Sequence, residues 1–128
     1  MNHDEFVGKV QNRAHLPSRG DAETIIRATF ETLGERLQPH AAEHVAAQLP
    51  PELGRHLTNR TFEHLSVQEF EERVAEREHA DVEKAIFHTR CVLDTVRDAI
   101  SPGAVQKLRQ QLPREFQPFL RASGRGLI

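Results

Sequence analysis

Apolar residues recur every three or four positions along most of the chain, with charged residues between them. This spacing is typical of amphipathic α-helices, and the strict alternation of a half-buried strand is absent. A first stretch, from about residue 4 to 13, carries Phe6, Val10 and Ala14 on one helical face. A longer stretch, from about residue 21 to 38, continues the pattern. The sequence therefore predicts an all-α protein.

Prolines mark where the following helices begin. Pro39 and Pro102 each follow a long amphipathic stretch, and proline fits the first turn of a helix because its missing N–H costs no hydrogen bond there. The helices that they open both reach a Gln-Leu-Pro sequence, at Pro50 and Pro113. Since the residue before a proline avoids helical dihedral angles, we predict a break at these points and a short fourth helix after each.

The same pattern occurs twice in the sequence. Residues 4–57 align with residues 68–120, at an offset of 64 that becomes 63 after one extra residue in the first loop. Of the 47 positions compared, 4–13 and 21–57, 14 are identical. We interpret this agreement as an internal duplication.

The duplication predicts the architecture. We expect a compact eight-helix bundle, built from two tandem four-helix repeats with approximate twofold pseudosymmetry. Repeat one covers about residues 4–57, a linker covers 58–65, and repeat two covers about 66–120. Because about 54 residues alone bury too little surface for comfortable stability, we expect one domain over residues 1–128. Its tail, 121–128, contains glycine and lacks periodicity, so we expect it to fray.

Charge and composition narrow the function classes. The chain has 17 Lys and Arg against 19 Asp and Glu, a net charge of −2, with the two signs interleaved. This balance argues against a dedicated binder of nucleic acid or of an anionic membrane. One cysteine, Cys91, excludes an intramolecular disulfide. Since the chain shows neither a transmembrane stretch nor a signal peptide, we place it in the cytoplasm.

Motifs shared by the two copies support a family resemblance. Each copy begins with Glu-Phe-x-x-x-Val-x-x-Arg, at Glu5 and at Glu69, and ends with Gln-Leu-Pro-x-Glu, at Gln48 and at Gln111. With the long second helix, these motifs resemble the bacterial domain-of-unknown-function 2267 family over about residues 4–120. The resemblance implies a bacterial, soluble, helical protein, and that family offers no established activity, cofactor or catalytic residue to carry over.

One string has the spacing of a metal site. His40-Ala-Ala-Glu-His44 matches the H-x-x-E-H pattern of inverted zinc peptidases, with two imidazoles one helical turn apart. The matching positions in the second copy are Gly103 and Lys107, and no second motif supplies the third protein ligand that a catalytic zinc requires. We favour two solvated histidines. A small metal-dependent hydrolase using His40, Glu43 and His44 is the alternative.

Several polar residues are identical in the two copies. They are Arg13/Arg77, Arg27/Arg90, Thr32/Thr95, Gln48/Gln111 and Glu52/Glu115. A structural interpretation pairs an arginine of the first or second helix with the glutamate of the fourth helix, within each copy. A functional interpretation has Arg27 and Arg90 facing one groove, where they hold an acidic segment of a partner.

The sequence contains no convincing set of catalytic residues. The glutamates between residues 71 and 78 alternate with arginines, which is typical of a solvated helix face. We therefore predict a non-catalytic interaction or scaffold module without cofactor, whose partner is another protein or a second copy of the chain. A cleft between the two repeats would suit such a partner. Weak nucleic-acid binding is a further alternative, through Arg109, Arg114, Arg121 and Arg125.

Overall fold

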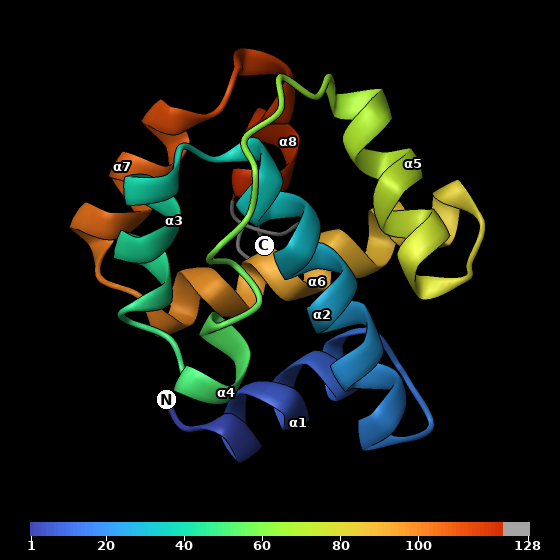
Figure 1. Cartoon of the computed structure of the whole chain (residues 1–128). Coiled ribbons are helices and arrows are strands. Elements are labelled where there is room, and N and C mark those ends of the chain that lie inside the picture. Colours follow the sequence, from blue (N-terminus) through green and yellow to red (C-terminus); the bar gives the residue numbers. More distant parts are fainter. Residues whose placement is uncertain (122–128) are drawn as a thin grey trace.

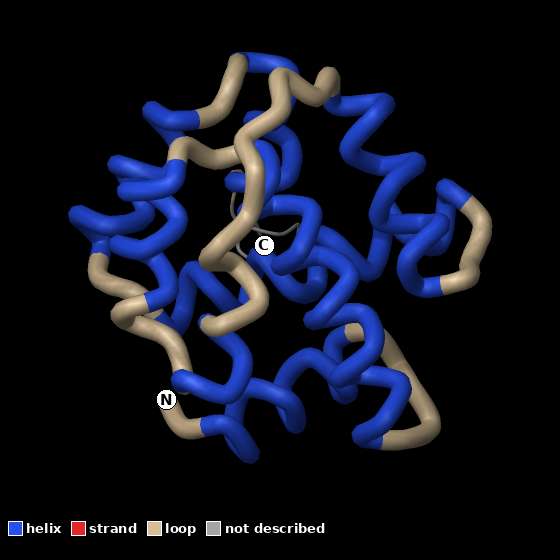
Figure 2. Tube along the Cα trace, viewed as in Figure 1, coloured by secondary structure: helices blue, strands red, loops and turns tan. Residues whose placement is uncertain are grey.

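The computed structural model describes residues 1–121, and their fold is all-α, as predicted (Figures 1 and 2). The helices are α1 (His3–Arg13), α2 (Arg19–Arg36), α3 (Pro39–Ala46), α4 (Pro51–Gly54), α5 (Val67–Glu78), α6 (Val82–Ala99), α7 (Pro102–Gln111), the 3₁₀ helix η1 (Arg114–Phe116) and α8 (Gln117–Leu120). We call residues 1–57 the first half and residues 66–121 the second half. Across residues 1–121, no helix combines the length and hydropathy that a bilayer span requires.

Short polar side chains begin most of the helices. Asn2 accepts a hydrogen bond from the backbone N–H of Glu5 at 2.8 Å, and the Glu5 carboxylate bonds back to the N–H of Asn2. Ser66 and Glu69 form the same reciprocal capping box at the start of α5. Ser101 caps α7, whereas Gln38 makes no side-chain cap at α3. The start of α3 is therefore left without the acceptor that the other long helices have.

The breaks at the two Gln-Leu-Pro sequences are confirmed, with one difference between the halves. In the first half α4 begins directly at Pro51. In the second half a 3₁₀ turn comes first, and α8 begins at Gln117, just before Pro118. The reason is the placement of the second proline, because proline without an N–H fits only the first turn of a helix.

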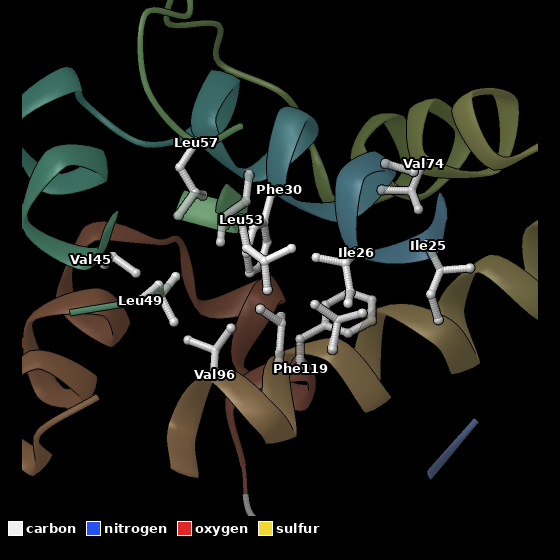
Figure 3. Packing of buried hydrophobic residues seen from close by; sticks show 14 of the residues in the cluster. Ile25, Ile26, Phe30, Val45, Leu49, Leu53, Leu57, Val74, Val96 and Phe119 are labelled. Carbon is white, nitrogen blue, oxygen red and sulfur yellow. The ribbon is translucent and has the colours of Figure 1, made fainter. Parts of the chain in front are cut away.

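The first helix of each half packs on both long helices. Helix α1 contacts α2 and α6, α5 contacts α6 and α2, and the long helices α2 and α6 contact each other. One hydrophobic cluster includes buried residues of both halves. Figure 3 shows side chains from both, among them Phe30, Leu49, Val96 and Phe119, directed into one interior. Helices α3 and α7 meet at one side of this core (left in Figure 1).

The linker crosses the end of α2 (green in Figure 1). The backbone N–H of Glu63 donates to the carbonyl oxygen of Glu35 at 2.7 Å, and Nε of Arg36 donates to the carbonyl oxygen of Leu65 at 2.8 Å. The guanidinium of Arg36 lies over the rings of Phe62 and Phe116. These contacts tie the linker to both halves, since Phe116 belongs to the second.

Candidate functional site

A groove of about 390 Å³ lies between α3 and α7, where the third helices of the two halves meet. Its lining residues are His40, Ala41, His44 and Val45 from α3, and Ala104, Lys107, Leu108, Gln110 and Gln111 from α7. The volume falls within the range of about 300–1,000 Å³ that is usual for ligand pockets. The two walls are formed by corresponding faces of α3 and α7, which are aligned in the sequence. Each half of the chain therefore contributes one wall.

The groove has an apolar floor and a polar rim. Ala41 and Val45 are four residues apart on α3, as Ala104 and Leu108 are on α7, so each pair shares one inward face. All four are buried. The polar lining residues of α3 are exposed, and so is Lys107 on α7. A ligand in the groove would therefore meet apolar and polar surface in similar amounts.

Three rim side chains have no partner within residues 1–121. No hydrogen bond or ion pair there involves the side chains of His40, His44 or Lys107. The groove thus presents one fixed positive charge and two imidazoles, all free to bind a ligand.

The groove contains the two histidines of the H-x-x-E-H string. They line the same wall, while Glu43 is exposed and is not among the lining residues. In the described part of the chain, no three His, Cys, Asp or Glu side chains come close enough together to hold a metal. The opposite wall supplies Lys107 and glutamines. The geometry therefore offers two of the three protein ligands that a catalytic zinc requires.

On residues 1–121, the groove that Arg27 lines does not include Arg90. Nε of Arg27 bonds to Oε2 of Glu31 at 2.9 Å, one turn along α2. Arg27 lines a second groove, of about 410 Å³, whose lining residues all lie between His3 and His56, in the first half. Arg90 is exposed on α6 and does not line it.

The repeat-matched arginines of the first helices join the two halves. Both bind a threonine and an acid on the long helix of the other half: Arg13 binds Thr95 and Asp98, and Arg77 binds Thr32 and Glu35. Each threonine hydroxyl also donates to the carbonyl oxygen four residues before it. This double role explains why both positions are threonine in both halves, because a hydroxyl can accept and donate at once.

The prediction that these arginines pair with the glutamate of a fourth helix is therefore wrong. Neither Arg13 nor Arg77 pairs with the glutamate of a fourth helix. Glu115 instead accepts a hydrogen bond from the backbone N–H of Val67, the first residue of α5, at 2.9 Å. Gln48 likewise accepts from the backbone N–H of Ser101 at 2.8 Å. These contacts place polar side chains at the starts of helices, where free N–H groups need acceptors.

Glu35 is the centre of an ion-pair network that the helical pattern did not reveal. Its carboxylate lies 3.0 Å from Arg73 and 2.7 Å from Arg77, and Arg60 approaches at 3.4 Å. Burial by itself would raise the pKa of Glu35. The hydrogen bonds from Arg77 and Arg73 outweigh that effect, and the pKa lies below its ordinary value.

Glu78 is buried, although the pattern of charges placed it on a solvated face. Its side chain is 1% exposed, and Oε1 lies 2.6 Å from Nδ1 of His88. The other carboxylate oxygen has no hydrogen-bond partner. Burial raises the pKa of Glu78, and the neighbouring imidazole opposes this only in part. At the matched positions the first half has Ala14 and Ile25, so the alignment itself carried a signal of burial.

One of the arginines considered for nucleic-acid binding has a structural contact instead. Nη2 of Arg109 donates to the carbonyl oxygen of Leu120 at 2.9 Å, so this side chain holds the end of the second half. Arg114 and Arg121 are exposed. Arg125 and the rest of the tail expected to fray lie outside the described residues.

Comparison with known proteins identifies the family. No curated protein matches the chain. A family profile covers almost all of the described helices, and it agrees with the resemblance carried by the Glu-Phe and Gln-Leu-Pro motifs. Over residues 3–119, the chain belongs to DUF2267, a family of uncharacterized conserved proteins.

Proposed function

We propose that this protein is a non-catalytic interaction module that holds a segment of another protein in the groove between α3 and α7. The observation that carries the proposal is the unpartnered rim. His40, His44 and Lys107 surround the groove and bind nothing else within residues 1–121. A polar rim over an apolar floor, on packed helices, is a usual arrangement for recognising a peptide segment.

The position of the groove also favours this function. Each half supplies one wall, and the polar contacts between halves at Arg13 and Arg77 hold the two walls in a fixed relation. A groove on rigid elements loses little conformational entropy when it binds, which raises affinity. We prefer it to the groove lined by Arg27, because Arg27 already pairs with Glu31.

We further propose that the two halves are tandem copies of one unit, with approximate twofold pseudosymmetry. The 14 identities support this origin, and so do the reciprocal contacts of Arg13 and Arg77. Under this proposal the groove lies where the equivalent third helices meet. A site between two copies can bind a partner that neither copy holds alone.

A photo-cross-linking experiment tests the interaction. A photoreactive amino acid replaces Gln110 on the groove or, as a control, Gln68, which is exposed on α5. Irradiation in a lysate of the native host is followed by mass spectrometry of the cross-linked peptides. We expect one protein segment joined at position 110 and absent at position 68. Equal labelling from both positions, or none at position 110, contradicts the proposal.

A further inference from the structure

We infer that the segment held between α3 and α7 is acidic, its carboxylates pairing with the rim. This inference rests on the proposed function and adds the chemistry of the partner. All the ionisable side chains that line the groove are cationic or imidazole, namely Lys107, His40 and His44. No carboxylate of the described chain lines it, because Glu43 lies on another face of α3.

The groove's charge differs in sign from that of the whole protein. The chain has a net charge of −2. Arg13, Arg60 and Arg77 form ion pairs with acidic side chains of the same chain. Lys107 places a positive charge on the groove and has no side-chain partner within residues 1–121. Charge complementarity at a rim selects partners and accelerates association, so an unpaired cation on a weakly acidic protein favours an acidic partner.

Both walls offer hydrogen-bond donors at matched positions. His44 and Lys107 correspond in the alignment, one on each wall, and His40 lies one turn before His44. An imidazole donates at least one N–H whether neutral or charged, and an ammonium donates three. Carboxylates are the acceptors that such a set of donors binds best.

A protein segment fits this surface better than nucleic acid does. Binding to a phosphate backbone relies on many Lys and Arg contacts that release counterions. The groove has one lysine and no arginine. Its floor of Ala41 and Ala104 leaves space for small apolar side chains between the carboxylates. The occupant is thus an acidic peptide segment with small apolar residues.

Selection from a random peptide library displayed on phage tests the chemistry directly. The intact protein is the bait, and we expect the enriched peptides to be rich in Asp and Glu. Lys107→Glu should weaken binding of an enriched peptide about tenfold. The matched control is Lys9→Glu, which makes the same change of charge at an exposed site on α1, outside the groove. It should leave the affinity within about twofold, since distant surface charges are screened.

A second groove variant and a competing ligand, duplex DNA, separate this inference from its alternatives. His40→Gln with His44→Gln preserves polarity, and it should also weaken acidic peptides, because two donors are altered. Enriched peptides that depend on Lys107 but are not acidic overturn this inference and leave the proposed function standing. Peptides whose affinity neither groove variant changes overturn both the inference and the proposed function. Displacement of acidic peptides by duplex DNA at low concentration overturns the inference in favour of nucleic acid.

Discussion

The long helices α2 and α6 correspond in sequence, yet the chain is held against their ends in different ways. Near the end of α2, a Cβ at Gly34 would lie 2.2 Å from the carbonyl oxygen of Leu57, so the backbone packs directly on the helix. At the matched position of α6, Arg97 donates to the carbonyl oxygens of Leu120 and Arg121. The segment at Leu57 is therefore held by direct backbone packing, and the matched segment at Leu120 is held by a guanidinium.

The next pair of matched positions, Glu35 and Asp98, also differs. The first acid is enclosed and the second is more open to solvent. The side chain of Glu35 is 10% exposed and that of Asp98 is 37% exposed. Asp98 pairs with Arg13, whereas three arginines surround Glu35: Arg60, Arg73 and Arg77. The linker accounts for part of the difference, since its Glu63 bonds to the backbone of Glu35 and its Arg60 pairs with the carboxylate. Arg73 of α5 accounts for the rest. The comparison shows that matched positions of α2 and α6 accommodate either contact.

The largest expected effect comes from filling the close approach at Gly34. Gly34→Ala should destabilise the fold by about 3 kcal/mol or more, because the added methyl meets backbone atoms of Leu57 that cannot move aside easily. Arg97→Ala, at the matched position, should cost only about 1 kcal/mol, the usual value of a partly exposed hydrogen-bonded contact. Chemical denaturation of both variants at pH 7 measures the difference. Equal losses would show that the two ends are held alike.

A smaller contrast is expected for the matched acids. Glu35→Gln should lower the free energy of unfolding by about 2 kcal/mol, because three arginines lose a shared and largely enclosed partner. Asp98→Asn should cost about 0.5 kcal/mol, as exposed ion pairs do. Urea denaturation provides the values, and Asp98→Asn is the matched control. A loss at Asp98 as large as at Glu35 would rule out the idea that the linker strengthens the first contact.

The sequence predicted the helices and the identity of the joining residues, but not their partners. Apolar periodicity and Pro39 and Pro102 marked the elements correctly, because these signals are local. The identity of Arg13 with Arg77 indicated a shared role. Their partners depend on which long helix each first helix packs against, and packing between halves leaves no local signal in the sequence.

The sequence likewise indicated one wall of the candidate site and not the other. The H-x-x-E-H string placed His40 and His44 together on one face of a helix, which the structure bears out. The second wall, with Lys107, could not be inferred, since it depends on how α3 meets α7. Glu78 and His88 were missed although the alignment set them opposite Ala14 and Ile25. A charged residue aligned with an apolar residue of the other half is a signal of burial that periodicity alone does not give.

The last prediction concerns the buried pair of Glu78 and His88. Glu78→Ala with His88→Ile gives the second half the residues of the first, at positions where Ala14 and Ile25 are 5% and 4% exposed. Removing a buried ion pair relieves its desolvation cost, and the smaller Ala and Ile side chains leave a cavity that offsets part of this. The double variant should therefore gain at most about 1 kcal/mol at pH 7. Glu78→Ala alone should be destabilising, because it leaves the buried imidazole of His88 without its partner.

The gain of the double variant should depend on pH, with a definite sign. Burial raises the pKa of Glu78 above its ordinary value, and Asp81 adds to the rise while His88 opposes it. A carboxyl with a raised folded pKa contributes stability below its unfolded pKa and loses it as the pH rises through the folded value. The wild type therefore weakens relative to the variant over that window, and the gain grows from pH 4 to pH 7. Thermal melting of both proteins across this range measures it. A gain that stays constant would mean that Glu78 titrates alike in the folded and unfolded chain, which its enclosed, partly unbonded carboxylate argues against.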